Sequence, residues 1–306
     1  MTNNAPRTIE DYLRQLRAAL ADQDPALIQD ALYDAEEYLR AEIVARSGKS
    51  EADVLELIAL TYGAPEEVAA AYRDTEIKVT AALRPPLKPR GRSALARFFG
   101  VFTDARAYAG LLFMVFSLAT GILYFVVTIV GTSLSLGLAV LVIGVPFFFA
   151  FIGVTRVLAL VECRLVETVS GVRMPRRPPH PGAPQRFWGR VRSMLTDVRT
   201  WTTLGYNVLM LPVGITYFVM AITGLSVSFG LIAAPILQGV RAVGGFGSDS
   251  VFADGGIQME PHWMNSPGGL LLCLLIGIVL LTATLHLSRA IARGHAFIAK
   301  SMLVLP

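Results

Sequence analysis

The chain has 306 residues, of which 54% are hydrophobic and only 16% are charged, and its mean hydropathy is +0.55. This composition excludes an ordinary soluble globular protein and indicates an integral membrane protein. The formal charge of +4 is unevenly distributed, because residues 1–83 carry 8 Lys/Arg against 16 Asp/Glu and the rest of the chain is basic.

Residues 1–83 show the periodicity of four short amphipathic helices. Thr8 is expected to cap the first helix, Asp24 the second and Ser50 the third, and the fourth follows the break at 62–65. We expect one thin core, which a second copy of the chain or a partner could complete. Its predicted members are Ile9, Leu13, Leu16, Leu20, Ile28, Leu32, Ala35, Leu39, Ile43, Val54, Leu57, Ile58, Val68, Ala69 and Tyr72.

Four motifs mark these helices in order: Tyr-Leu-x-x-Leu, Asp-Ala-Glu-Glu-Tyr, Gly-Lys-Ser-Glu and Tyr-Gly-Ala-Pro-Glu-Glu-Val-Ala. Over residues 7–80 this order resembles the HAAS domain, the HTH-associated alpha-helical signalling domain. The resemblance implies a cytoplasmic signalling module, commonly encoded beside a PadR-type winged-helix repressor. Since no winged helix is present in this sequence, we expect no direct contact with nucleic acid. The candidate partner-binding residues are Asp30, Asp34, Glu37, Tyr62, Gly63 and Pro65, although an acidic helix face can also be merely solvated.

The region after residue 93 contains a duplication without gaps, at an offset of 93 positions. Asp-Ala-Arg-Ala-Tyr from Asp104 recurs as Asp-Val-Arg-Thr-Trp from Asp197, and Gly-Ile-Leu-Tyr-Phe-Val from Gly121 recurs as Gly-Ile-Thr-Tyr-Phe-Val from Gly214. A Ser-x-Ser-x-Gly-Leu element also occurs in each copy. We therefore divide the chain into the helical domain 1–83, a Pro/Arg-rich linker 84–93, repeat 1 at 94–166, a basic loop 167–186 and repeat 2 at 187–303.

Each repeat begins with an amphipathic helix that is expected to lie at the membrane surface. Its candidate contacts with anionic lipid headgroups are Arg97 in repeat 1 and Trp188 and Arg190 in repeat 2. Apolar runs then predict four membrane spans, at about 107–130, 143–163, 202–223 and 268–287. The apolar stretches 133–142 and 226–237 are too short to cross, so extracytoplasmic and re-entrant placements both remain open for them.

The distribution of arginine predicts the topology of the chain. The segments 84–106 and 164–199 are densely basic, whereas 238–267 is not, so we expect both termini in the cytoplasm and 238–267 outside. The first thirty residues do not have the pattern of a cleavable signal peptide. The expected location is the bacterial cytoplasmic membrane.

The paired motifs over residues 95–303 resemble the "putative sensor" membrane domain. The motif residues that become candidates for function in the membrane domain are Asp104, Arg106, Tyr124, Asp197, Arg199 and Tyr217. Arg156 joins them because a charge within an apolar segment marks a functional position if it lies deep in the membrane. The alternative interpretation is that Arg156 snorkels to the cytoplasmic surface and that Glu162 already lies outside the bilayer.

No phosphate-binding glycine loop, no nucleophile with an adjacent base and no histidine pair at metal-ligand spacing is found in the sequence. We therefore expect neither catalysis nor a metal or other cofactor. The predicted fold is all-α, with a four-helix cytoplasmic bundle and a duplicated four-span membrane domain. The predicted function is a membrane sensor that relays a membrane or envelope state to a cytoplasmic regulator. The alternative is an accessory subunit of a membrane transport complex.

Overall fold

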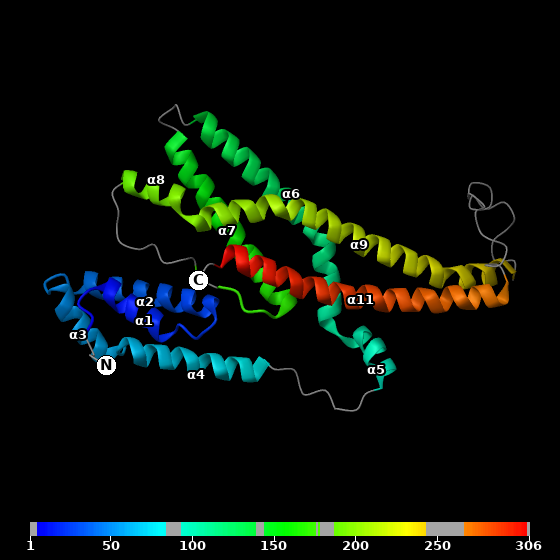
Figure 1. Cartoon of the computed structure of the whole chain (residues 1–306), viewed down its shortest axis with the longest axis horizontal. Coiled ribbons are helices and arrows are strands. Elements are labelled where there is room, and N and C mark those ends of the chain that lie inside the picture. The colour runs from blue at the N-terminus through cyan, green and yellow to red at the C-terminus, as the bar shows by residue number, and fades with distance from the viewer. Residues whose placement is uncertain are drawn as a thin grey trace. The chain divides into compact units, whose positions relative to one another are not determined.

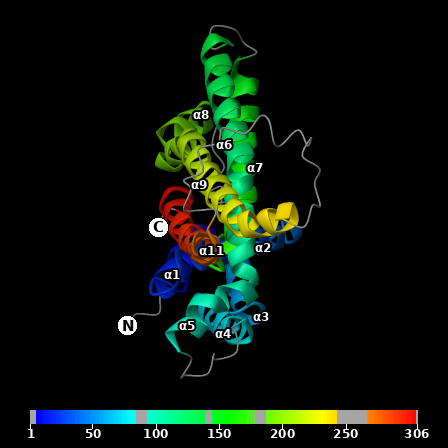
Figure 2. The ribbon, with the colours of Figure 1, turned by 90° about the vertical axis from the view of Figure 1, so that its right-hand side faces the viewer.

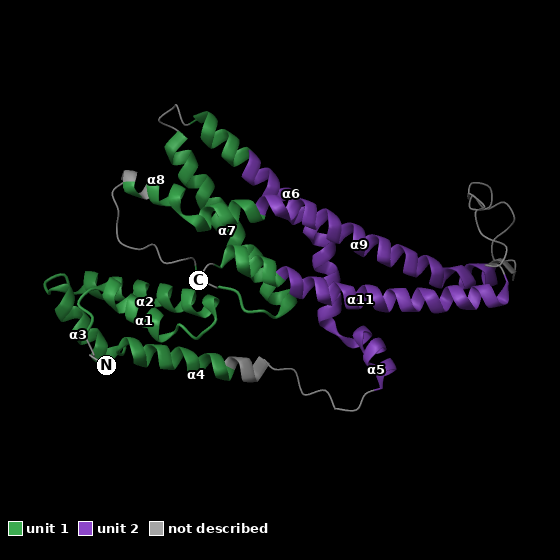
Figure 3. Cartoon of the chain, in the orientation of Figure 1, with its two compact units in different colours: residues 1–90, 130–206, 296–306 green, residues 91–129, 207–295 purple. Residues whose placement is uncertain are grey.

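The structure of the chain is a computed structural model, which describes residues 5–83, 93–138, 144–175, 177, 187–242 and 266–304 (Figure 1). Every regular element in these ranges is a helix, which confirms the all-α prediction. The chain divides into two compact units (Figure 3): unit 1 comprises residues 1–90, 130–206 and 296–306, and unit 2 comprises residues 91–129 and 207–295. Each unit therefore contains parts of both repeats.

Within unit 1, the N-terminal domain forms four helices as predicted: α1 (Ile9–Ala19), α2 (Pro25–Ala45), α3 (Glu51–Thr61) and α4 (Pro65–Leu83). The predicted caps are present. The side chains of Thr8, Asp24 and Ser50 accept hydrogen bonds from the backbone N–H groups of Asp11, Ala26 and Asp53, respectively. Each cap satisfies a backbone donor that has no partner inside its own helix, so the sequence fixes where these helices begin.

The apolar faces of these helices meet in one small core, and α1 packs on both α2 and α4. Tyr12 is fully buried there, and its hydroxyl donates to the carbonyl oxygen of Gly63 at 2.9 Å. Leu55, rather than the predicted Leu57, faces the core of α3. The buried members that were predicted are Leu13, Leu16, Leu20, Leu32, Ala35, Leu39, Val54, Ile58, Val68 and Ala69.

The membrane domain consists of longer helices. In chain order these are α5 (Ala94–Phe99), the short 3₁₀ helix η1 (Gly100–Thr103), α6 (Ala105–Gly137), α7 (Gly144–Ser170), α8 (Phe187–Thr196), α9 (Val198–Ala242) and α11 (Pro267–Leu303). Four of them, α6, α7, α9 and α11, are long and apolar enough to cross a membrane. Many of their apolar side chains are exposed, including Leu112 and Leu271, as expected for faces that contact lipid. The chain is therefore a multi-pass membrane protein.

Three of these helices extend well beyond the predicted spans. The Ser-x-Ser-x-Gly element of repeat 1 forms the last turns of α6, and residues 226–237 continue α9, so neither segment is a re-entrant or separate stretch in the described residues. α11 continues to Leu303, well past the predicted end at 287. At 1.5 Å per residue the 45 residues of α9 extend about 68 Å, more than the ~30 Å of a hydrocarbon core, so this helix continues beyond a single membrane crossing. α9 even includes Pro212 and Pro235.

In unit 2, α9 and α11 lie side by side in both views (Figures 1 and 2), and Gly277 of α11 contacts Ile232 of α9. In unit 1, the end of α6 lies beside the start of α7, where a Cβ on Gly131 would overlap the ring of Phe151. The predictions for 84–92, 139–143, 178–186 and 243–265 concern segments outside the described residues.

Candidate functional site

The Asp-x-Arg-x-aromatic motif forms the entry to the first span of each repeat. In repeat 1 the carboxylate of Asp104 accepts a hydrogen bond from the backbone N–H of Arg106 at 3.1 Å. In repeat 2 the carboxylate of Asp197 accepts one from the N–H of Arg199 at 3.0 Å. A negative charge at this position also favours the positive end of the helix dipole. The two aspartates are therefore N-caps of α6 and α9.

The aromatic residue of the motif completes the same entry. The hydroxyl of Tyr108 donates to the carbonyl oxygen of Phe102 at 3.0 Å, and the indole N–H of Trp201 donates to that of Leu195 at 2.8 Å. Trp201 follows Tyr108 by 93 positions, and Leu195 follows Phe102 by the same 93 positions, so the two hydrogen bonds are equivalent. Each aromatic side chain thus fixes the turn from the preceding short helix into the span.

Each capping aspartate also pairs with an arginine on the second span of the other repeat. Asp104 lies 3.0 Å from Arg289 of α11, and Asp197 lies 3.8 Å from Arg156 of α7. Arg289 follows Arg156 by 133 positions. The second spans are therefore also duplicated, at an offset of 133 positions instead of 93. The 40 additional residues lie between the two spans of repeat 2. This relation was missed because a search at 93 positions does not reveal it.

The two first spans cross within unit 2 at equivalent glycines. A Cβ on Gly121 of α6 would overlap the carbonyl oxygen of Met210, and a Cβ on Gly214 of α9 would overlap that of Ser117. Ser117 and Met210 are themselves 93 positions apart. Such close backbone contact is typical of helix packing in membranes. Small residues there let the two backbones approach, so that van der Waals contacts hold the helices together.

Two ionisable side chains are fully buried at equivalent positions of the second spans. Glu162 of α7 is 0% exposed, and the hydroxyl of Tyr206 donates to its carboxylate at 2.9 Å. Its counterpart His295 of α11 is 1% exposed and packs against the rings of Phe113 and Tyr217, with centroids 5.0 and 5.7 Å away. Glu162 is therefore buried within the protein, with the phenol of Tyr206 as its partner, and its placement outside the bilayer stays a prediction.

The acidic face of α2 contacts described residues of the segment that follows α7. We call residues 171–175 and 177 the connecting segment. Arg173 pairs with Asp30 at 3.2 Å and also with Glu76 of α4. The backbone N–H of Arg177 donates to Asp30 at 2.9 Å, and its side chain pairs with Asp34 at 3.0 Å. Asp30 is only 5% exposed, so this part of the acidic face is not solvated.

Gln29 of α2 and the cap residue Asp24 make three further contacts within unit 1. A guanidinium nitrogen of Arg199 donates to the side-chain oxygen of Gln29 at 2.6 Å, and the amide nitrogen of Gln29 donates to the carbonyl of Arg177 at 2.6 Å. Near the end of α11, Lys300 pairs with Asp24 at 2.5 Å. The N-terminal domain is thus attached to α7, α9 and α11 within unit 1.

The other candidates have local structural roles or remain untested. Gly63 has φ +111°, which favours glycine, while Tyr62 stacks on Tyr38 with centroids 4.3 Å apart. Pro65 begins α4 and is buried, whereas Glu37 is exposed. Tyr62, Gly63 and Pro65 form the turn between α3 and α4, whereas Glu37 lies on α2. Partner binding by these four residues stays a prediction.

The predicted headgroup contacts lie on the short helices α5 and α8. Arg97 of α5 is exposed, as a headgroup contact requires, but the side chains of Trp188 and Arg190 on α8 lie outside the described residues. His286 contacts α5 instead of solvent, since its ring nitrogen lies 3.0 Å from the carbonyl oxygen of Phe98. Tyr124 is buried, at 2% exposure.

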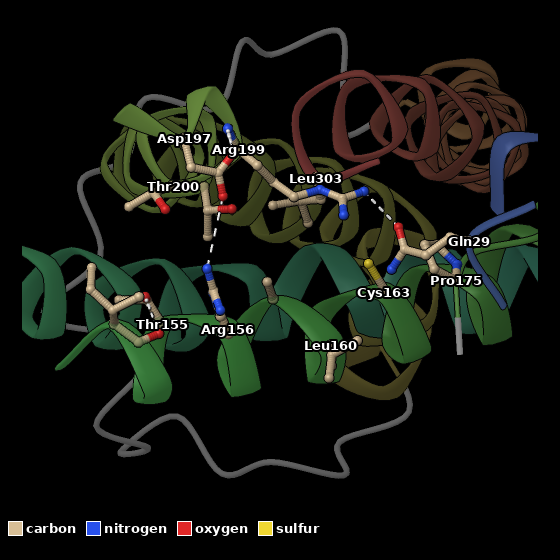
Figure 4. A pocket seen from close by; sticks show the side chains of 13 residues that line it. Gln29, Thr155, Arg156, Leu160, Cys163, Pro175, Asp197, Arg199, Thr200 and Leu303 are labelled. Atoms are coloured by element: carbon tan, nitrogen blue, oxygen red, sulfur yellow. Dashed lines mark hydrogen bonds and ion pairs between the residues drawn. The ribbon is translucent and has the colours of Figure 1, made fainter. Parts of the chain in front are cut away.

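Two cavities with shared lining residues lie beside the start of α9 in unit 1. The smaller, of about 50 Å³, is lined by Arg156, Arg199, Asp197 and Gln29 and by several apolar residues, and we call it the arginine pocket (Figure 4). Figure 4 shows Arg156 of α7 reaching towards Asp197, while Arg199 reaches towards Gln29. The larger, of about 300 Å³, is mostly apolar, and we call it the apolar cavity. Thr200 lines both cavities.

Residues 113–303 match the family model described as "Putative sensor". The chain belongs to this sensor family. The match covers spanning helices of both repeats, in agreement with the resemblance seen in the paired motifs. Comparison with curated proteins and with solved structures gives no match.

Proposed function

We propose that this member of the sensor family is a non-enzymatic signalling protein of the bacterial cytoplasmic membrane. Its membrane domain senses a state of the membrane or envelope, and its N-terminal helical domain passes that state to a cytoplasmic regulator. The sensor family supports the first half of this proposal. The contacts between the N-terminal domain and the spanning helices support the second half.

The observation that carries the proposal is the bridge made by Arg173. This residue lies three positions after the end of α7 and pairs at once with Asp30 of α2 and Glu76 of α4. A shift or rotation at the end of α7 must therefore move the N-terminal domain or break these two pairs. These partly buried ion pairs are either formed or broken, and a contact with two discrete arrangements suits a relay.

The same bridge sets the direction of signalling that we propose. Asp30 and Asp34 are candidates for partner binding, and both are occupied by the connecting segment in this structure. A basic partner surface can use them only after Arg173 and Arg177 have left. The docked state is then the silent state, and release of the N-terminal domain exposes its acidic face. The HAAS resemblance makes a winged-helix regulator the expected partner.

The test is affinity capture of the full-length protein from its native membrane in a gentle detergent, beside a form lacking residues 1–83. We expect a winged-helix regulator to be recovered only with the N-terminal domain present, and more of it with Arg173→Gln. Arg164→Gln is the matched control, because Arg164 is an exposed arginine of α7 that pairs along its own helix with Glu167. Recovery of transporter subunits, or of the same partners without residues 1–83, would instead favour the accessory-subunit function.

A further inference from the structure

A buried hydroxyl without a partner belongs to Thr200, which lines both cavities. The side chain of Thr200 is 9% exposed, and its hydroxyl oxygen makes no hydrogen bond within the described part of the chain. Leaving such a group unsatisfied is unfavourable. Thr200 lines both the arginine pocket and the apolar cavity, so a molecule that occupies both would bring a polar group to this hydroxyl.

The apolar cavity is suited to a hydrocarbon chain. Phe148, Phe151, Trp201 and Leu204 form much of its wall, on helices that are long and apolar enough to span a membrane. Its volume of about 300 Å³ is at the lower end of the range for ligand pockets. Within a bilayer the molecules available to fill it are lipids, whose acyl chains surround these helices.

The arginine pocket carries two cationic side chains against one anionic side chain. Arg156 and Arg199 line it together with Asp197, which lies 3.8 Å from Arg156, so the pocket keeps a net positive charge. Guanidinium groups bind phosphate oxygens with charge-assisted hydrogen bonds. Gly144, in the wall of the apolar cavity, and Arg156 are twelve residues apart on α7, a rise of about 18 Å. One leaflet of the hydrocarbon core is about 15 Å thick, so the two cavities together match the length of a lipid in one leaflet.

The other copy of the duplication is closed at the equivalent place. Ala107 takes the position of Thr200, and the hydroxyl of Ser288, the counterpart of Thr155, donates to the Ala107 carbonyl at 2.8 Å. Gly110, the counterpart of a threonine in repeat 2, lets α11 approach so closely that a Cβ would lie 2.8 Å from the Ser288 carbonyl oxygen. Repeat 2 therefore has the polar side chains of Thr200 and Thr203 where Ala107 and Gly110 of repeat 1 contact the backbone of α11 directly.

We propose that the two cavities form one binding site for an anionic phospholipid. Its acyl chain occupies the apolar cavity, its glycerol and ester region hydrogen-bonds to Thr200, and its phosphate binds Arg156 and Arg199. This inference rests on the proposed sensing function and names the class of molecule sensed. Because Arg199 also holds Gln29 of α2, a bound phosphate competes with the N-terminal domain for the same guanidinium. Lipid binding thereby favours release of that domain.

The binding test measures quenching of Trp201 fluorescence by phospholipids with brominated acyl chains. It uses the full-length protein in detergent, with Trp188→Phe and Trp263→Phe removing the other two indoles. We compare brominated phosphatidylglycerol with phosphatidylcholine that carries the same brominated chains. Glycerol phosphate, which has no acyl chain, serves as the competitor. We expect phosphatidylglycerol to bind at least tenfold more tightly than phosphatidylcholine, with no competition by glycerol phosphate.

Three variants assign the preference to this site. Arg156→Gln combined with Arg199→Gln should abolish the tenfold preference, and Thr200→Val should weaken binding about fivefold by removing one hydrogen bond while keeping the shape. Arg289→Gln, the equivalent of Arg156 in the closed copy, should change neither. Equal quenching by the two lipids, or a preference that survives the double substitution in protein that elutes as wild type, overturns the proposal. Competition by glycerol phosphate does so too, since it would indicate a plain anion site.

A second readout separates this inference from the proposed function. Hydrogen exchange of the connecting segment is measured with and without phosphatidylglycerol, and the inference expects faster exchange with the lipid. Lipid binding without this change would overturn the coupling to the N-terminal domain, while the site would stand. Absence of lipid preference together with a partner that depends on residues 1–83 would overturn the lipid site, while the relay would stand.

Discussion

Arg173→Gln is the most direct perturbation of the contact between the N-terminal domain and the membrane domain. The side chain of Arg173 is 19% exposed, and those of its partners Asp30 and Glu76 are 7% and 25% exposed. Removing one member of a buried ion pair costs about 3–5 kcal/mol. The lower end applies, because the N–H of Arg177 still donates to Asp30 and Glu76 is partly solvated. About 3 kcal/mol corresponds to a docking constant lower by roughly 150-fold.

The assay is hydrogen exchange with mass spectrometry on the full-length protein in lipid nanodiscs. The N–H of Arg177 is hydrogen-bonded to Asp30 only while the N-terminal domain is docked, so it reports the docked fraction. We expect exchange of peptides covering 171–177 to become faster by on the order of 100-fold in Arg173→Gln. Arg164→Gln should leave it unchanged.

Two results would refute this reasoning. Equal exchange at 171–177 in the wild type and in Arg173→Gln would show that the arginine does not hold the N-terminal domain in place. Faster exchange of α1 peptides as well would show that the domain had unfolded instead of detaching, since α1 contributes to the core but makes no contact in this bridge.

Three further predictions concern the structural frame. Gly121→Ala should lower the melting temperature of the detergent-solubilised protein, because overpacking at a helix crossing typically costs about 1–3 kcal/mol, whereas Gly153→Ala, with open space around it, should not. Asp104→Asn should destabilise more than Asp197→Asn, since the ion pair of Asp104 is shorter and more buried; the reverse order in thermal melts would contradict the geometry. Burial raises the pKa of Tyr12 above its ordinary value of about 10, so its stabilising contribution is complete below pH ~10 and is lost as the pH rises further. The tyrosinate absorbance that Tyr12→Phe removes should accordingly appear only above that pH.

The N-terminal domain could be predicted closely because its signals are local. The side chains of Thr8 and Ser50 hydrogen-bond within three residues, and a helix of period 3.6 places Leu13, Leu16 and Leu20 on one face. Such signals do not depend on the rest of the chain. The spanning helices could be found but not delimited, because an apolar run shows that a helix crosses and does not show where it ends.

The contacts between distant segments could not be predicted in the same way. Asp30 and Arg173 are 143 positions apart, and nothing local in either sequence pattern selects the other. The partner of Glu162 was missed for the same reason, although its equivalence to His295 at an offset of 133 would have marked both as interior positions. An alignment of the two repeats that allows an insertion between the spans would have revealed the equivalence of Glu162 and His295.

The duplication separates positions that build the frame from positions that can carry function. Residues that are alike in both copies, such as the capping aspartates and the crossing glycines, make equivalent contacts twice, so neither copy gains a special role from them. Specificity must then come from positions where the copies differ while the frame around them is the same. Thr200, facing two cavities where repeat 1 has a closed alanine contact, is such a position. A sensor built from two copies can thus keep one copy as a rigid support and use the other to bind.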